Sequence, residues 1–176
     1  MKITLVISDL TSGGAQRVLT LLANYWDEQG HNVTLVTLDD GLNIFYHLNP
    51  NIEVVSANVN SISKNTFEVI HKNYKRIKIL RRVLLETKPA VIISFLVGVN
   101  ALVILSTLFS RIKVIVSERN NPQYCTNRIM IWMFIRRCLY PLASHLVVQT
   151  EGVMRLLNSI IKILRLYLIQ YQPFQI

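Results

Sequence analysis

A glycine turn at Ser12–Arg17 holds the residues in this chain that are best suited to bind a ligand. It follows an apolar run, Ile3–Ser8, and opens a segment whose apolar residues recur three or four positions apart. Glycines let the backbone turn tightly and approach a ligand closely, and the first N–H groups of a helix suit a phosphate. The order of strand, Gly13-Gly14 and helix therefore indicates a nucleotide or phosphate site, although an ordinary tight connection explains the same residues. The turn does not match GxGxxG, so no dinucleotide fingerprint is indicated.

A second polar group, Glu118-Arg119-Asn120, directly follows the apolar run Lys113–Ser117. A carboxylate in this position could accept a proton from a substrate hydroxyl, or it could pair with Arg119 or with another arginine. Three polar residues after a strand also form an ordinary loop. The four histidines and two cysteines lack the spacing of a metal site, so we expect no metal, and the candidate chemistry lies in these two turns.

Short apolar runs and amphipathic segments alternate along the chain. We expect strands at Ile3–Ser8, Val33–Leu38, Ile52–Val55, Val91–Phe95, Lys113–Ser117 and His145–Gln149. We expect helices at Ala15–Gln29, Thr66–Thr87, Asn100–Phe109 and Arg128–Tyr140, and from Glu151 onward. This alternation predicts an α/β fold with a doubly wound, mostly parallel, Rossmann-like sheet and helices on both faces.

Ligands of such sheets bind beyond the carboxyl ends of the strands. The loops Asp9–Gly14 and Ser117–Pro122 follow two of these ends. One stretch, Ala90–Phe109, is uncharged and long enough to cross a bilayer. Its β-branched beginning and the interruptions at Gly98 and Asn100 favour a buried strand, a turn and a buried helix instead.

The charge balance favours an anionic partner. The 176 residues carry a formal net charge of +9, and 51% of them are hydrophobic, which argues against disorder and for one substantial core. We do not expect nucleic-acid binding, because no known motif accompanies the charge. No signal-peptide cleavage site precedes the first strand, so we expect a cytoplasmic protein.

Two segments could dock on an anionic membrane surface. The helix Thr66–Thr87 carries basic residues on one face, which also fit an ordinary solvated helix: Lys72, Lys75, Arg76, Lys78, Arg81 and Arg82. The second segment combines basic and apolar residues in the way that suits a bilayer surface, and these are Arg128, Arg136, Arg137, Trp132, Met133 and Phe134. We expect a peripheral position on the inner face of the membrane.

Four segments together resemble the amino-terminal domain of glycosyltransferase family 4, one half of the two-domain GT-B architecture. They are SGGAQRVLTLLANYWDEQGHNVTLVTLD, KPAVIISFLVGVNAL, VIVSERNNP and HLVVQTEGV, which begin at Ser12, Lys88, Val114 and His145. The resemblance implies transfer of a sugar from a UDP- or GDP-sugar to a glycan or lipid-linked acceptor in cell-surface polysaccharide synthesis, usually with retention at the anomeric carbon and without a structural metal or other cofactor. In this family the amino-terminal domain holds the acceptor and the carboxyl-terminal domain grips most of the donor.

The same resemblance assigns roles by motif position. Gly13 and Gly14 would let the donor diphosphate approach, and Arg17 would be either a phosphate partner or a surface cation. Glu118, Arg119 and Asn120 would line the acceptor side of the cleft, with Glu118 as a candidate catalytic residue that could equally form an ion pair.

The last part of the sequence departs from the family pattern. We expect an acceptor-side domain at residues 1–150 and, at 151–176, an interdomain helix with a truncated tail. One choice of codons for Ile163–Gln172, read in a shifted frame, encodes IKVIPNPVS, the continuation that the resemblance implies, so we expect a frameshift near Lys162. The competing interpretations are an inactive fragment or binding module without a donor domain, and a basic peripheral membrane protein of unrelated role.

Overall fold

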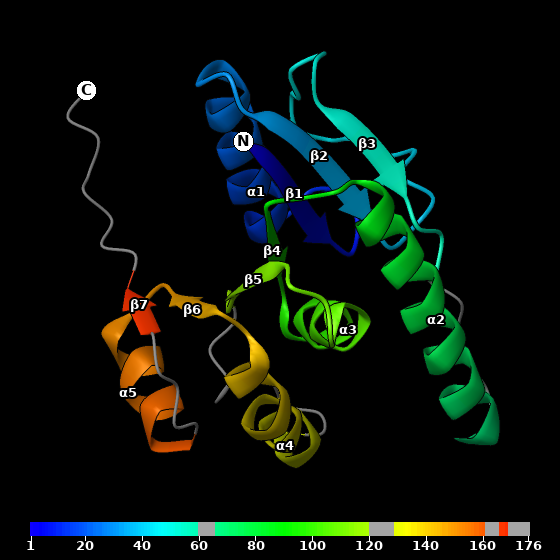
Figure 1. The fold of residues 1–176 in the computed structure, drawn as a ribbon. Helices are drawn as coiled ribbons and strands as arrows, with labels where there is room; N and C mark the ends of the chain where they lie inside the picture. The colour runs from blue at the N-terminus through cyan, green and yellow to red at the C-terminus, as the bar shows by residue number, and fades with distance from the viewer. Residues whose placement is uncertain (60–65, 120–128, 161–165, 169–176) are drawn as a thin grey trace.

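The computed structural model describes residues 1–59, 66–119, 129–160 and 166–168 (Figure 1). Strands and helices alternate along the described residues, as the sequence predicts. The strands are β1 (Lys2–Ile7), β2 (Asn32–Thr37), β3 (Glu53–Ser56), β4 (Val91–Phe95), β5 (Lys113–Ser117), β6 (His145–Val148) and β7 (Leu166–Leu168). The helices are α1 (Gly14–Glu28), α2 (Thr66–Glu86), α3 (Val97–Thr107), α4 (Ile129–Leu139) and α5 (Glu151–Ile160), with a 3-10 turn η2 (Tyr140–Leu142) after α4.

The strands form one parallel sheet in the order β3-β2-β1-β4-β5-β6-β7. Val6 of β1 pairs with Ser94 of β4, and Ser94 pairs with Val116 of β5. The chain moves outward from β1 to β3, returns through α2 to β4, and then continues to the other edge. Because right-handed crossovers in opposite directions fall on opposite faces of a sheet, this order places helices on both faces. The prediction of a doubly wound, Rossmann-like sheet is confirmed.

The two faces are covered unequally. In the described part of the chain, α1 packs on one face, where Leu19 and Ala23 join Leu5 and Ile7 of β1 in a buried cluster. The opposite face holds the larger cluster, to which α2, α3 and α5 contribute Leu84, Val103 and Leu157. Figure 1 shows α3 in front of the sheet, between α2 and α4. Both faces of the central strands are therefore buried, which explains their continuous apolar sequences.

The connection between β4 and α3 differs from the prediction. The helix begins at Val97 rather than Asn100, because the single residue Leu96, at φ 76°, makes the whole turn from the strand. It ends at Thr107 rather than Phe109. Gly98 lies inside the helix and does not interrupt it. A Cβ at this position would be 3.7 Å from the ring of Trp132, so α4 packs closely over this turn of α3. Tertiary packing here overrides the low helix propensity of glycine.

Within the stretch Ala90–Phe109, most residues of β4 and α3 are buried, as the sequence predicts, whereas Phe109 beyond the end of α3 is exposed. Among the described residues, no helix has both the length and the apolar character needed to cross a bilayer.

Several predicted features lie outside the described residues, namely Asn120 to Pro122, Arg128 and most of the tail after Ile160. Within the tail, Leu166–Leu168 pair with β6 as the edge strand β7.

Candidate functional site at the carboxyl edge of the sheet

The two turns that the sequence singles out lie at the same edge of the sheet. All described strand pairs are parallel, so the glycine turn after β1 and the Glu118 segment after β5 both leave the carboxyl edge. One strand, β4, separates β1 from β5. At a spacing of about 4.8 Å per strand, the ends of β1 and β5 are roughly 10 Å apart. This separation is compatible with one ligand that contacts both turns.

The glycine turn is built by local hydrogen bonds around Asp9. The Oδ1 atom of this carboxylate accepts from the Thr11 backbone N–H (3.2 Å), the Thr11 hydroxyl (2.5 Å) and Gln16 Nε2 (3.0 Å), while Oδ2 accepts from the Ser8 hydroxyl (2.7 Å). Gly13 is the N-cap of α1, and its carbonyl accepts from the Arg17 N–H at 2.9 Å. The Gly13 N–H points toward the Tyr46 hydroxyl at 3.4 Å. The sequence analysis placed Asp9 in this loop without assigning it a role, and it did not predict that Tyr46 contacts the turn.

These hydrogen bonds keep Asp9 ionised. Partial burial on its own would raise the pKa of this carboxyl, but the hydrogen bonds from Thr11, Ser8 and Gln16 together outweigh burial and hold the pKa below the ordinary value of 3.8. The turn therefore already contains one negative charge close to the start of α1, where the helix dipole stabilises it.

The two glycines face different surroundings. A Cβ at Gly13 would collide with the side-chain oxygen of Gln16, whereas a Cβ at Gly14 would have nothing within 4 Å. Gly14 and Arg17 are both exposed. A side chain at Gly13 would therefore displace the end of Gln16, which donates to Asp9, whereas Gly14 leaves an open approach to the backbone.

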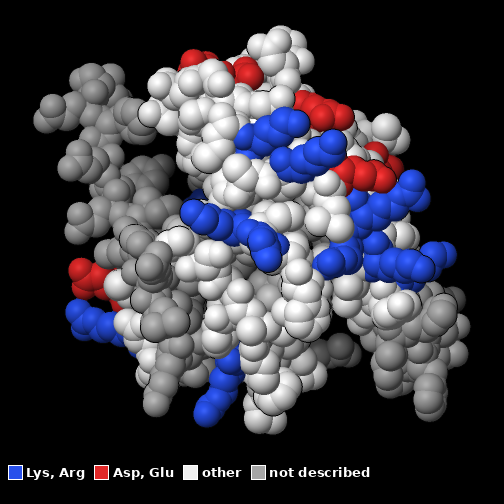
Figure 2. All heavy atoms as spheres, viewed as in Figure 1, with Lys and Arg blue, Asp and Glu red and all other residues white. Residues whose placement is uncertain are grey.

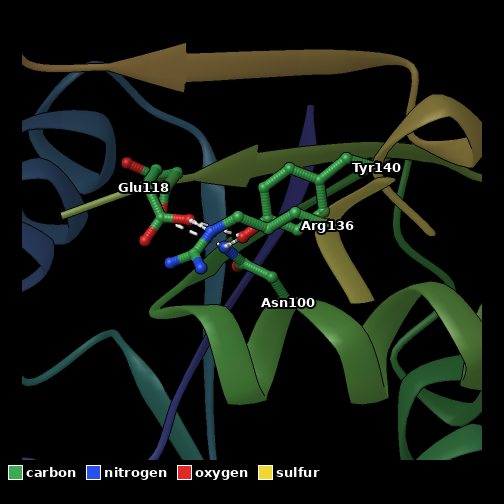
Figure 3. A network of polar contacts seen from close by, with 5 residues as sticks. Asn100, Glu118, Arg136 and Tyr140 are labelled. Atoms are coloured by element: carbon green, nitrogen blue, oxygen red, sulfur yellow. Dashed lines mark hydrogen bonds and ion pairs between the residues drawn. The ribbon is translucent and has the colours of Figure 1, made fainter. Parts of the chain in front are cut away.

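The Glu118 side chain does not face an open cleft. It is only 2% exposed, and its Oε2 atom accepts from Arg136 Nε at 2.9 Å and from the Tyr140 hydroxyl at 2.8 Å (Figure 3). Arg136 is equally buried. Of the alternatives that the sequence left open for Glu118, the structure shows an ion pair, and the partner is an arginine of α4 rather than Arg119.

The ion pair belongs to a larger buried group, which we call the Glu118 network: Ser94, Asn100, Glu118, Arg136 and Tyr140. Asn100 Nδ2 donates to the Tyr140 hydroxyl (3.1 Å) and to the Ser117 carbonyl (3.2 Å), and Asn100 Oδ1 accepts from the Ser94 hydroxyl (2.7 Å). Burial, followed by the negative charge of Glu118, raises the pKa of Tyr140 well above 10.0, so its hydroxyl stays protonated and donates. The network ties β4, α3, β5, α4 and η2 together below the carboxyl edge.

The assignment of Arg136 to a membrane-facing basic segment was therefore wrong. Arg136 and Tyr140 are four residues apart, one helical turn, and both side chains point inward to Glu118. The sequence does place a tyrosine and an arginine on one helical face, but nothing in the local pattern says that this face is buried or that Glu118 is its partner.

Arg119 lies next to the network and is held by different contacts. Its guanidinium carbon is 4.6 Å from the centre of the Phe95 ring, a cation–π contact with the last residue of β4. In the amide orientation of Gln149 that satisfies both groups, the Gln149 oxygen accepts from Arg119 Nη1 at 2.8 Å and its nitrogen donates to the Arg119 carbonyl at 3.3 Å. Arg119 is half-buried, and Asn120 falls outside the described residues.

On both surfaces that were expected to contact the membrane, some of the predicted residues are held within the fold. Basic side chains gather over α2 in Figure 2, yet Arg76 donates to the Val59 carbonyl and Arg81 donates to the carbonyls of Ser106 and Leu108. These two arginines hold neighbouring segments. Among the basic residues of this face whose side chains are described, Lys75, Lys78 and Arg82 are exposed. On α4, the exposed apolar residues are Met130, Ile131 and Phe134, and Arg137 is exposed beside them.

Within the described ranges, no group of three or more His, Cys, Asp or Glu side chains is placed to hold a metal ion. The polar chemistry of the carboxyl edge therefore rests on Asp9, the Glu118 network and the arginines Arg17 and Arg119.

Comparison with known proteins places this geometry in a family. The sequence profile of Glycosyltransferase Family 4 matches residues 12–165. The chain is 34% identical over 146 residues to a Campylobacter jejuni (subsp. jejuni serotype O:2) transferase named GalNAc-alpha-(1->4)-GalNAc-alpha-(1->3)-diNAcBac-PP-undecaprenol alpha-1,4-N-acetyl-D-galactosaminyltransferase, and the match covers 83% of this chain and 39% of that protein.

Solved structures show the same fold at low sequence identity. Sucrose-phosphate synthase from Thermosynechococcus elongatus matches with a TM-score of 0.75 at 11% identity, over 96% of this chain and 47% of that chain. TcCGT1, solved in complex with UDP, matches with a TM-score of 0.63 at 14% identity, over 96% of this chain and 50% of that chain. The chain thus spans about half the length, or less, of these three proteins, and its fold corresponds to one domain of the GT-B architecture. On the profile match and the Campylobacter relative, the chain belongs to glycosyltransferase family 4, as an amino-terminal-type domain of that family.

Proposed function

We propose that this chain is the acceptor-side domain of a glycosyltransferase that moves a sugar from a nucleotide-sugar to a lipid-linked glycan in cell-surface polysaccharide synthesis. The observation that carries the proposal is the 34% identity with the Campylobacter enzyme, whose name describes an acceptor linked to undecaprenol through PP. The carboxyl edge supports it, because two polar turns leave adjacent parts of the sheet there. We assign this role to residues 1–150, with residues 151–176 leading toward a donor domain.

For the donor, we propose a UDP- or GDP-sugar with retention at the anomeric carbon. Gly13 and Gly14 would admit the diphosphate to the backbone, and the open space at Gly14 supports this assignment. Arg17 is exposed one turn into α1 and could reach a phosphate. The ionised Asp9 in the same turn limits how much additional negative charge it can hold, so the donor domain would supply most of the affinity.

On the acceptor side, we propose that Glu118 anchors its segment and that Arg119 and Asn120 face the acceptor. The Glu118 carboxylate is buried and its Oε2 atom already accepts hydrogen bonds from Arg136 and Tyr140, so it does not face an open cleft. This geometry favours the anchoring role over general-base catalysis for Glu118.

We also propose peripheral docking on the inner membrane face through α4. Its exposed Met130, Ile131 and Phe134 would enter the lipid headgroup region, and Arg137 would contact anionic lipid. Sedimentation with phosphatidylglycerol-containing vesicles tests this part. Phe134→Ser should reduce vesicle binding, and Tyr74→Ser, an equally exposed aromatic on α2, is the matched control. Equal binding by both variants would contradict docking through α4.

A second candidate function is a non-catalytic binding module. In that case the chain would bind an acceptor and transfer nothing.

A chimera separates the alternatives. Residues 12–165, which match the family profile, would replace the corresponding segment of the Campylobacter enzyme. Transfer of labelled sugar from UDP- and GDP-sugars to polyprenyl-diphosphate-linked glycans would then be measured. We expect the chimera to be active and the chain alone to be inactive. A folded chimera that transfers no sugar to any of these acceptors would refute the proposed role, and transfer by the chain alone would exclude the binding-module alternative.

A further inference from the structure

The segment between β2 and β3, residues 38–52, places an exposed aromatic ring beside the glycine turn. We propose that Phe45 provides the surface on which a neutral sugar ring of the acceptor stacks, and that it is a specificity-determining residue for the acceptor. The inference rests on the proposed function, because it takes the carboxyl edge as the substrate side. It assigns a sugar of the acceptor to a segment that the sequence pattern marks only as a loop.

The backbone of this segment is fixed against the glycine turn and α1. The Phe45 N–H donates to the Leu10 carbonyl at 3.0 Å, which holds the segment beside the start of the turn. Farther along, Asn24 of α1 donates to the His47 carbonyl at 3.0 Å and accepts from the Asn49 N–H at 2.9 Å. The position of Phe45 is therefore set before a ligand binds, which lowers the entropy cost of binding.

The ring of Phe45 is held by its neighbour and remains accessible. It meets the Tyr46 ring nearly perpendicularly, with 5.0 Å between the ring centroids and 80° between the planes. The Gly13 N–H in turn points toward the Tyr46 hydroxyl at 3.4 Å. A perpendicular pair covers at most one face of either ring. Because Phe45 is 66% exposed, its ring offers a ligand an open aromatic face.

A neutral sugar ring matches the groups around Phe45. The face of an aromatic ring carries partial negative charge, so it attracts the polarised C–H groups on the apolar side of a pyranose. The adjoining turn offers the ionised carboxylate of Asp9 to sugar hydroxyls. In the described part of the chain, only the Ser8 hydroxyl donates to its Oδ2 atom, at 2.7 Å, so this oxygen can accept another hydrogen bond. The same negative charge repels a phosphate, which favours a sugar of the acceptor over the donor diphosphate.

A lipid chain is the other ligand that would cover exposed apolar side chains. Leu42, in the same segment, is 79% exposed. A polyprenyl chain against Phe45, however, would remove water from the Asp9 carboxylate and from the exposed Thr11 without replacing the lost hydrogen bonds, which is costly. Sugar hydroxyls replace those bonds, so the polar turn beside the ring favours a glycan.

The distance along the carboxyl edge also fits an oligosaccharide. The strands β1 and β4 lie between β2 and β5. At about 4.8 Å per strand, the segments that follow β2 and β5 are roughly 14 Å apart. An acceptor that contacts both segments must therefore be extended, as a chain of sugars is.

Saturation-transfer difference NMR of the chain with neutral disaccharides of hexoses and N-acetylhexosamines tests the inference. We expect saturation to reach the C–H protons on one face of a sugar ring. Phe45→Leu should weaken binding about fivefold, because leucine keeps an apolar surface and loses the aromatic face, whereas Phe45→Trp should retain the affinity of the wild type. Leu42→Ser removes a more exposed apolar side chain from the same segment and is the matched control, with an expected change below about twofold.

Two further probes separate the sources of such a ligand. UDP-GalNAc carries a donor sugar, and geranylgeraniol is a neutral lipid. If Phe45→Leu weakened only the binding of UDP-GalNAc, the ring would serve the donor. If the chain bound geranylgeraniol but no disaccharide, with a loss in Leu42→Ser, the segment would bind lipid. Either result would contradict the assignment to the acceptor's sugar.

Three other results would overturn the inference: unchanged disaccharide binding by Phe45→Leu, equal losses in Phe45→Leu and Leu42→Ser, or no disaccharide binding by the folded wild-type chain. The thermal midpoint of each variant, compared with that of the wild type, shows that it is folded.

The chimera keeps this failure distinct from failure of the proposed function. In the chimera, Phe45→Leu should raise KM for the acceptor about fivefold and leave kcat and KM for the donor nearly unchanged. An active chimera whose acceptor KM does not depend on Phe45 refutes only the role of Phe45. An inactive chimera whose disaccharide binding depends on Phe45 refutes only the proposed transfer.

Discussion

The glycine turn and the Glu118 network lie at the same edge of one sheet, but they are built in opposite ways. The bonds to Asp9 in the glycine turn come from residues no more than seven positions away. In the Glu118 network, the bonds among Asn100, Glu118, Arg136 and Tyr140 span 18 to 40 positions, and the bond from Ser94 to Asn100 spans 6. The turn is exposed at Gly14 and Arg17, whereas Glu118 and Arg136 are buried.

The difference indicates that the two regions have different roles. A local, open turn can admit a ligand to its backbone at little structural cost. A buried ion pair adds little net stability compared with apolar packing, because both charges lose their hydration, so its best explanation here is that it fixes the position of the segment carrying Arg119.

The largest effect is expected for Arg136→Met. This change leaves the Glu118 carboxylate buried without its cation, and we expect a loss of about 3–5 kcal/mol in the free energy of unfolding. Urea denaturation measures it, with exposed Arg137→Met as the control. The double variant Glu118→Leu with Arg136→Met should recover most of the loss, and a single variant as stable as the wild type would contradict the importance of the pair.

Tyr140→Phe should have the next largest effect. It removes the hydroxyl that donates to Glu118 and accepts from Asn100, at a cost of about 1–3 kcal/mol. Because the pKa of Tyr140 is higher in the folded state, the unfolded chain ionises first, and its contribution to stability is complete below pH 10.0 and declines above it. When the free energy of unfolding is measured below and above pH 10.0, it should fall less with rising pH in Tyr140→Phe than in the exposed control Tyr74→Phe.

In the glycine turn, alanine substitutions at Gly13 and Gly14 should have different effects on stability. Gly13→Ala forces Gln16 away from Asp9 and should cost about 0.5–1.5 kcal/mol. Gly14→Ala adds a methyl group in open space at the first residue of a helix, so stability should stay the same or rise by up to about 1 kcal/mol. Thermal denaturation of the pair tests this, and equal losses would show that both glycines serve only the fold.

The smallest effect is expected for Asp9→Asn. The pKa of Asp9 is lowered in the folded state, so its contribution is present above pH 3.8 and is lost as pH falls through the folded-state pKa. The group is largely solvated, and the difference near neutral pH should be only a few tenths of a kcal/mol. The free energy of unfolding of the wild type, Asp9→Asn and the control Asp40→Asn would be measured as the pH is lowered. If wild type and Asp9→Asn differed by the same amount at neutral and at low pH, the charge of Asp9 would not contribute to stability.

Local patterns predicted most of the fold. The apolar runs and the spacing of the helices located nearly every described strand and helix, because each depends on periodicities that neighbouring residues determine. The start of α3 was missed by three residues, since Leu96 adopts a left-handed conformation that only its packing explains. The residues of the carboxyl edge were likewise found from two local motifs, but their partners were not.

The sequence by itself determined the alternation of strands and helices, the glycine turn and the position of a charged segment after β5, because these follow from short-range spacing and from the residue types involved. Only the tertiary structure decided that Arg136 points inward to Glu118, that Phe95 and Gln149 support Arg119, and that Arg81 holds the end of α3. These contacts join residues that are distant in the chain. The partner of each buried charge is determined only when the sheet brings β4, β5 and β6 side by side and α4 packs against α3.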